Sequence, residues 1–282
     1  MSTLSTSGIS PIGGPGEAGS GTGGEVVVFI FFVFALSRLT FSSEDRTEGW
    51  TSLVRDPELR LGLAIVLILP VLMFMRHWVA TFEDDALITL QEGLLGLWGA
   101  VFTVASFLTT TGFESASWGS ARAWSGLSSP GVILLGLALF GGGVATTAGG
   151  VKLLRVYALY KHGLREMEKL VQPSSIGGSG QAARRFRRQG AYVAWIFFML
   201  FAISIAVVSI TLAALGSGFE DALVLAIASL STTGPLVVSA SSSAIDMPAL
   251  ADGAKAVLIG AMVLGRLETL AIIALLNPEF WR

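Results

Sequence analysis

The sequence predicts an all-α integral membrane protein made of repeated helix–pore loop–helix units, with about five transmembrane helices and two re-entrant pore helices. Apolar residues make up 52% of the 282-residue chain and charged residues only 13%, whereas a soluble domain carries about 25% charged residues. The mean hydropathy is +0.71. In addition, a short motif of hydroxyl residues ending in glycine occurs three times, each time followed by a membrane-length apolar segment.

The expected spans follow from the apolar stretches, taken in chain order. A bilayer core of about 30 Å requires about 20 apolar residues in a helix. Five stretches approach that length: residues 26–40, 59–75, 131–160, 191–215 and 251–276. Two shorter apolar stretches, 94–108 and 222–230, end at copies of the glycine motif. We therefore expect these two to be re-entrant pore helices rather than full crossings.

The distribution of basic residues orients the spans. Nine of the 18 Lys and Arg residues lie between residues 152 and 188, and four more flank the loop after the first span. Both loops are expected to be cytoplasmic by the positive-inside rule. The other loops carry mainly Asp and Glu and are expected outside. This alternation holds only if each glycine motif enters and leaves the membrane on the outer side.

The repeated motif reads Leu-[Ser/Thr]-Thr-[Ser/Thr]-Gly and occupies residues 4–8, 108–112 and 230–234, called here the first, second and third motif. The second and third align over thirteen residues, 100–112 with 222–234. Glycine allows the backbone to turn its carbonyls toward an axis, and carbonyl oxygens can replace the water around a cation. A single copy would be explained more simply as a helix C-cap ending in glycine. Three copies at matched topological positions favour a cation-binding loop.

Residues 140–150, FGGGVATTAGG, form a second unusual segment, called here the broken segment. An unbroken helix of about 30 residues would be about 45 Å long, which exceeds the bilayer core. Five glycines and two threonines therefore predict a break, which could form a mobile constriction below the motifs. The alternative is a glycine-rich face for close helix packing. A phosphate-binding loop is excluded because the G-x-x-x-x-G-K-[ST] pattern is absent.

Arg266 is the third unusual feature, because it lies within the fifth apolar span. A charge at that depth is costly and is a functional candidate by default. It could face an ion path, or pair with a carbonyl or an acidic partner. Snorkelling of the side chain to the interface is the alternative.

The motifs, the FGGGVATTAGGVKLLRVY segment and the terminal GRLE…NPEFWR together resemble the TrkH branch of the Trk/Ktr/HKT potassium transporters. The resemblance covers essentially the whole chain. It implies one pore built from four linked repeats, each giving one filter glycine, with potassium held at the carbonyls around Thr6, Ser7, Gly8, Thr110, Thr111, Gly112, Thr232, Thr233 and Gly234. It also implies an intramembrane gating loop with Arg266 near the path, the loop residues being Gly141, Gly142, Gly143, Thr146, Thr147, Gly149 and Gly150.

The resemblance also divides the chain. Residues 1–58 match the end of the second repeat, 59–170 the third repeat, 171–190 a cytoplasmic basic linker and 191–282 the fourth repeat. By this comparison the first repeat is missing, so we expect a truncated pore with three of four filter loops. We further expect a multi-pass protein of the bacterial inner membrane that forms a homodimer. A cytosolic, nucleotide-binding TrkA-type ring is the expected partner, and residues 152–188 could contact it.

Two other functions are compatible with the sequence. One is permeation of sodium together with potassium, and the other is a non-conducting fragment or interaction subunit of a membrane complex. An intramembrane hydrolase would need a Ser–His or Ser–Lys pair at matched depth. Neither His77 nor His162 lies within a span, so we expect no enzyme. We also expect no cofactor and no nucleic-acid partner.

Overall fold

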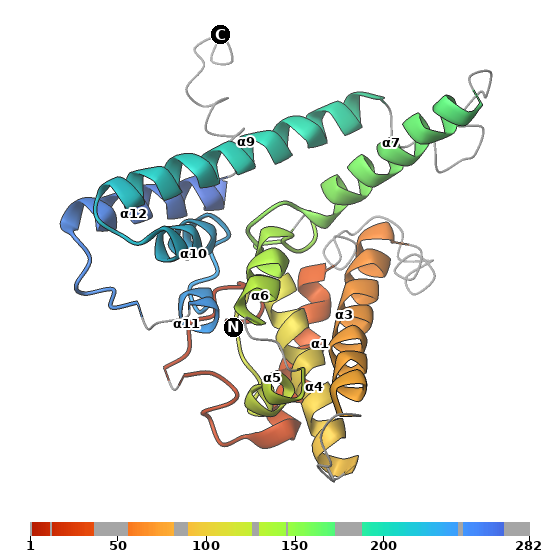
Figure 1. Ribbon diagram of the computed structural model, residues 1–282, viewed down its shortest axis with the longest axis vertical. Helices are drawn as coiled ribbons and strands as arrows, with labels where there is room; N and C mark the ends of the chain where they lie inside the picture. The colour runs from red at the N-terminus through yellow and green to blue at the C-terminus, as the bar shows by residue number, and fades with distance from the viewer. Residues whose placement is uncertain are drawn as a thin grey trace.

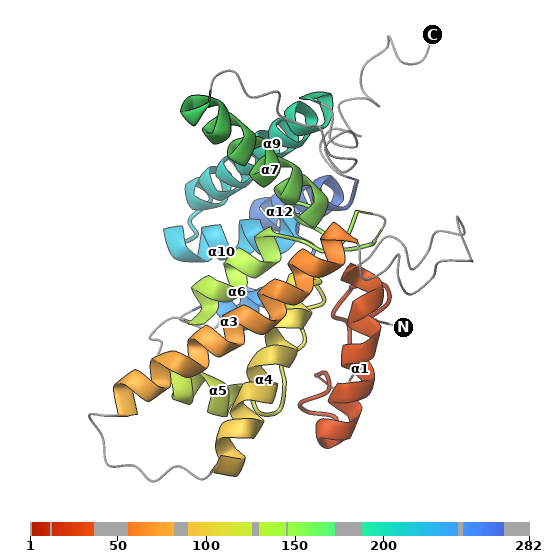
Figure 2. The same cartoon turned by 90° about the vertical axis from the view of Figure 1, so that its right-hand side faces the viewer.

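A computed structural model describes residues 2–11, 13–36, 56–81, 90–125, 130–144, 146–172, 188–241 and 245–267. Every regular element within these ranges is a helix. Most of the helices form two groups that meet near the middle of the long axis of the molecule (Figures 1 and 2).

The first group surrounds the second motif. It contains α1 (Gly21–Leu36), α3 (Pro57–Thr81), α4 (Leu90–Leu108), α5 (Trp118–Ser125) and α6 (Pro130–Leu139). The central helix is α4, which packs against the other four. Aromatic contacts join it to α1, such as Phe32 with Phe102 at 5.4 Å between ring centroids. Helix α4 ends at Leu108, the first residue of the second motif. The packing of α4 against its four neighbours therefore fixes the position of the start of this motif.

The second group surrounds the third motif. It contains α9 (Arg188–Ala214), α10 (Phe219–Leu230), α11 (Leu236–Ala240) and α12 (Asp252–Leu267). The short helix α10 lies between α9 and α12, and its residues from Val224 to Leu230 are buried. Glu220 and Asp221 lie in its first turn, where negative charge stabilises the positive end of the helix dipole. Helix α6 packs against α10 and α11 and so joins the two groups.

The third expected span, 131–160, is divided. Helix α6 ends at Leu139, the broken segment follows without regular structure, and α7 begins at Leu153 and continues to Val171. Helix α7 packs against α9 and α3, and its second half extends away from the rest of the molecule (Figure 1). The glycines and threonines thus interrupt the helix where the sequence predicted a break.

Within the described residues, two helices are long and apolar enough to cross a membrane, Pro57–Met75 and Gly190–Ala214. They coincide with the expected spans 59–75 and 191–215. Only 22% of the second stretch is buried, although it is apolar on all sides, as in a helix that faces lipid. Shorter apolar helices cover Gly21–Leu36, Gly93–Leu108 and Pro130–Leu139.

The remaining expectations lie partly outside the described residues. Helix α1 begins five residues before the expected span 26–40, and residues 37–40 lie outside the described ranges. Helix α12 begins at Asp252, and residues 268–276 of the fifth expected span also lie outside them. Most of the loop after the first span and the linker residues 173–187 also lie outside the described ranges.

Close packing of α12 on α10 depends on Gly265. A Cβ atom there would lie 2.7 Å from the carbonyl carbon of Leu230, whereas a Cβ atom at Gly260 on the same helix would meet no atom within 4 Å. Overpacking of this kind costs about 1–3 kcal/mol. We expect Gly265→Ala to lower the free energy of unfolding by that amount, measured by circular dichroism during denaturation in detergent micelles.

Gly260→Ala is the matched control and should be neutral or slightly stabilising, because alanine favours helix more than glycine does. Equal stability of the two variants would contradict the importance of the Gly265 contact.

Candidate functional site

The three motifs share one unusual backbone conformation. Among the described residues, the non-glycine residues with positive φ are Thr6, Thr110 and Thr232, with values of 49°, 57° and 56°. Each is the third residue of its motif. A left-handed conformation costs a non-glycine residue about 1–2 kcal/mol, so the surrounding contacts must hold each threonine in place.

Backbone hydrogen bonds repeat in the same way. In each motif the third residue donates its N–H to the carbonyl three residues earlier: Thr6 to Thr3 (3.4 Å), Thr110 to Phe107 (3.1 Å) and Thr232 to Ser229 (3.2 Å). The fourth residue donates to the carbonyl five residues earlier: Ser7 to Ser2 (3.1 Å), Thr111 to Ser106 (2.9 Å) and Thr233 to Ala228 (2.9 Å). This pair of bonds is the Schellman pattern that ends helices. At the second and third motifs this pattern ends α4 and α10, and a threonine takes the left-handed position next to the helix end, where glycine is the usual residue.

Side-chain hydroxyls repeat as well. The second and fourth residues of each motif pair through their hydroxyl oxygens: Ser5 with Ser7 at 3.1 Å, Thr109 with Thr111 at 3.2 Å, and Ser231 with Thr233 at 3.1 Å. These pairs fix two side chains of each motif against each other, which leaves the central threonine to make contacts elsewhere.

The three central threonines converge on the broken segment. The hydroxyl of Thr6 forms a hydrogen bond of 3.0 Å with that of Thr147. Gly149 donates its N–H to the Thr110 hydroxyl at 3.0 Å. A Cβ atom at Gly149 would lie 2.8 Å from the hydroxyl oxygen of Thr232. Motifs far apart in sequence thus meet at one place.

The motif glycines also meet at one place. A Cβ atom at Gly8 would overlap the carbonyl oxygen of Thr111 and would lie 2.9 Å from Cγ of Pro235. A Cβ atom at Gly112 would lie 3.1 Å from three ring atoms of Pro235. Gly8 and Gly112 have φ values of 63° and 81°, so both the conformation and the space favour glycine there. Gly234 precedes Pro235 and has neither a positive φ nor a close neighbour.

The helix dipoles at this place favour a cation. Helices α4 and α10 end at the second and third motifs, so their negative dipole ends lie at the point of convergence. A cavity of about 410 Å³ opens between the first motif and helices α10 and α12. Its lining includes Thr232, whose hydroxyl oxygen is buried without a hydrogen-bond partner among the described residues.

The broken segment is closed at its base. The N–H of Val151 donates to the Leu139 carbonyl at 2.8 Å, and the N–H of Leu153 donates to the Gly142 carbonyl at 3.2 Å. Gly143 donates to the Ala35 carbonyl at 2.9 Å. The segment is therefore a loop between α6 and α7 whose two ends lie side by side.

Three charged side chains from separate parts of the chain hold the broken segment. Arg266 on α12 donates Nη1 to the Thr147 carbonyl at 2.7 Å. Lys152, just before α7, donates Nζ to the carbonyls of Thr146, at 3.2 Å, and Ala148. Glu58 on α3 accepts the N–H of Val144 at 3.1 Å. The carbonyl partner considered for Arg266 is thus present.

Lys152 and Glu58 were not among the predicted site residues. Both are buried, at 6% and 0% exposure, and buried charges require partners. Their sequence positions gave no signal, because Lys152 stands among the many basic residues of 152–188 and Glu58 lies in an ordinary helix first turn.

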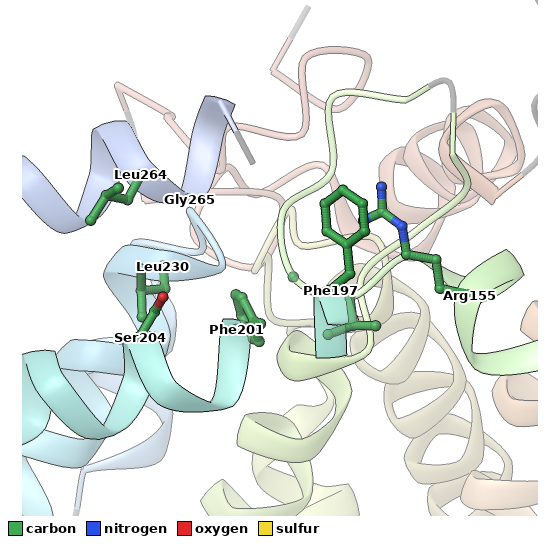
Figure 3. A pocket seen from close by; sticks show the side chains of 9 residues that line it. Arg155, Phe197, Phe201, Ser204, Leu230, Leu264 and Gly265 are labelled. Carbon is green, nitrogen blue, oxygen red and sulfur yellow. The ribbon is translucent and has the colours of Figure 1, made fainter. Parts of the chain in front are cut away.

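A small pocket beside the broken segment shows how α7 is anchored (Figure 3). The guanidinium of Arg155 lies 3.6 Å from the ring centroid of Phe197 on α9. A cation–π contact at this distance is favourable by about 0.5–2 kcal/mol. Gly150 and Val151 line the same pocket, so the base of the broken segment lies directly beside this contact.

The chain as a whole is similar to known proteins of one family. The family model described as "TrkH: Cation transport protein" matches residues 26–280. The Trk system potassium uptake protein TrkH of Salmonella typhimurium is 34% identical over 229 residues, which cover 81% of this chain and 44% of that protein. The TrkH protein of Escherichia coli K12 is 32% identical over 228 residues, with the same coverage.

The crystal structure of the potassium transporter TrkH from Vibrio parahaemolyticus superposes with a TM-score of 0.76 at 26% identity. The match covers 100% of this chain and 57% of that one. The chain therefore spans less than half the length of the two TrkH relatives and shares the fold of the solved structure over its whole length.

The contact between Thr110 and Gly149 is testable with an isosteric change. Thr110→Val leaves the Gly149 N–H without its acceptor, and an unsatisfied buried donor costs about 1–3 kcal/mol. We expect Thr110→Val to lower the free energy of unfolding by that amount and to speed hydrogen exchange at Gly149, measured by mass spectrometry.

Thr232→Val is the matched control, because its hydroxyl has no hydrogen-bond partner among the described residues. It should leave both quantities close to those of the wild type. Equal effects of the two substitutions would contradict the assigned contact.

Proposed function

Because this chain belongs to the TrkH family of cation transport proteins, we propose that it forms part of a membrane pore for potassium uptake. The observation that most supports this proposal is that three left-handed threonines, one per motif, converge on the broken segment. The uptake of potassium by the relatives, stated in their names, supports the choice of ion.

The proposed filter consists of the carbonyl and hydroxyl oxygens of the three motifs. A left-handed residue turns its peptide planes relative to those of its neighbours, so successive carbonyls can face one axis. Carbonyl rings of this kind replace the hydration shell of potassium. The nine residues proposed to line the path are Thr6, Ser7, Gly8, Thr110, Thr111, Gly112, Thr232, Thr233 and Gly234.

A fourth filter loop, from outside this sequence, is proposed to complete the pore. The cavity between the first motif and helices α10 and α12 supports this, because it is space beside the convergence that the described residues leave unfilled. The division of the chain at residues 58, 170 and 190 into parts of three repeats and a linker is part of the same proposal.

The broken segment is proposed to act as the gate. It lies against all three central threonines, and Arg266 brings a positive charge to its Thr147 carbonyl. A segment in this position blocks a cation until it moves, and the positive charge beside it raises the electrostatic barrier. We assign gating to Gly141, Gly142, Gly143, Thr146, Thr147, Gly149, Gly150 and Arg266.

The assembly is proposed to be a homodimer that crosses the bacterial inner membrane several times. A cytosolic nucleotide-binding ring of the TrkA type is the proposed regulatory partner. Helix α7 supports this part of the proposal, because it extends from the molecule and carries exposed basic residues such as Lys161 and Arg165. No enzymatic activity is proposed.

The function is tested by potassium flux into liposomes that contain the chain with and without a co-expressed N-terminal half of a TrkH relative. Potassium-selective flux in the completed assembly supports the proposal. Flux that appears only with the added half identifies the chain alone as a non-conducting subunit. Equal potassium and sodium flux would favour the co-permeation alternative, and no flux in either case would contradict the pore.

Substitution of the motif glycines tests the filter. A side chain at Gly112 would crowd Pro235 in a left-handed conformation, whereas Gly234 has open space. In the completed assembly we expect Gly112→Ser to lower the potassium-over-sodium permeability ratio by about 5-fold or more, equivalent to about 1 kcal/mol. Gly234→Ser should lower it less. Unchanged ratios in both variants would count against the filter assignment.

Removal of residues 141–150 tests the gate. Because Val151 bonds to the Leu139 carbonyl, the two ends are close enough to be rejoined. We expect the deletion to raise potassium flux severalfold, measured with equal amounts of folded protein in liposomes. Lower or unaltered flux would indicate a packing role for the segment.

A further inference from the structure

Glu25 is a buried carboxylate that the filter and gate described above do not use. It lies in the second turn of α1 and is only 1% exposed. Burial of a carboxylate is costly unless its oxygens receive hydrogen bonds. Its contacts therefore show what it holds in place.

Donors from two other elements surround Glu25. Trp98 on α4 donates its indole N–H to Oε2 at 2.8 Å. The Ser115 hydroxyl lies 2.9 Å from Oε1 and 3.0 Å from Oε2. The N–H of Ala116 donates to Oε1 at 2.7 Å. Hydrogen bonds to an ionised acceptor are roughly twice as strong as neutral ones, so Glu25 ties α1 to α4 and to the segment that leaves the second motif.

That exit segment, residues 113–117, is held from both sides. On the α4 side, Phe113 donates its N–H to the Ser106 hydroxyl at 2.6 Å, and Ser115 donates to the Thr103 hydroxyl at 3.3 Å. On the opposite side, a Cβ atom at Gly16 would lie 3.3 Å from the Ala116 nitrogen. Glu25 adds the charged contact at the end of this segment.

The third motif has a different exit. Pro235 follows Gly234 directly, and α11 begins at Leu236. Val238 and Ser239 donate their N–H groups to the Pro235 carbonyl, so helical bonds stiffen this exit. Residues 113–115 of the second exit have no regular structure and depend on side chains for their position.

We infer that Glu25 is a positioning residue that fixes the outer end of the second motif and thereby the ion selectivity of the pore. The inference rests on the proposed function. The helix-ending bonds fix the inner end of the motif, and the Glu25 carboxylate fixes the outer end through Ser115 and Ala116. With both ends fixed, the carbonyls keep the spacing suited to the larger potassium ion. When the outer end is released, they can contract around sodium.

The test replaces the carboxylate with its isosteric amide. Glu25→Gln keeps the shape but turns an NH₂ group toward the surrounding donors. In the completed assembly we expect the potassium-over-sodium permeability ratio to fall by about 2- to 30-fold, the range for residues that act through others. In the purified chain in lipid vesicles, hydrogen exchange of the 113–117 segment should become faster.

Two milder variants each remove one donor, Trp98→Phe and Ser115→Ala. Both should lower the potassium-over-sodium permeability ratio and speed hydrogen exchange of residues 113–117, by smaller factors than Glu25→Gln. If Glu25→Gln fails to fold, these two variants test the inference in its place. Asp252→Asn is the matched carboxylate-to-amide control, because its side chain is fully exposed at the start of α12. It should leave both readouts at the wild-type values.

The outcomes separate this inference from the proposed function. Wild-type ratios in Glu25→Gln and both milder variants overturn the inference and leave the pore intact, even if exchange in 113–117 becomes faster. Slower flux at an unchanged ratio would likewise overturn it. Loss of cation flux in the wild-type assembly itself would overturn the proposed function and, with it, the selectivity role of Glu25.

Discussion

Backbone that leaves the helical conformation inside a membrane has no water to satisfy its polar groups, so each freed N–H and C=O needs a partner within the protein. The motifs and the broken segment both contain such backbone, and each supplies partners for the other. Gly149 bonds to Thr110, and Thr6 bonds to Thr147. Glu58, Lys152 and Arg266 satisfy much of what remains in the broken segment. The position of the broken segment is therefore coupled to the conformation of the motifs.

The sequence contained the signals that depend on local composition. Repetition of the motif predicted which segments leave helices, and the glycines of 140–150 predicted the interruption between α6 and α7. The all-helical class and the family were also predicted and are confirmed. The left-handed threonines were not predicted, because glycine is the usual residue at that position.

Buried charges were the main omission. In the sequence, Lys152 and Glu25 cannot be told apart from charged residues at the surface. Only the tertiary packing brings their hydrogen-bond partners close to them. Lys152 belongs to a stretch of many bases, most of which are exposed or outside the described residues. Arg266 could be recognised because it interrupts an apolar span. The roles assigned to the motif and gating residues stay predictions.

The three central threonines share one backbone conformation but have three different surroundings. Thr6 meets a hydroxyl, Thr110 meets an amide, and Thr232 has no hydrogen-bond partner among the described residues. In a ring of identical subunits, one codon change alters every quadrant at once. In the proposed pore each quadrant that this chain builds has its own codon, so natural variation can change one quadrant at a time and preserve an asymmetry that a symmetric channel cannot hold.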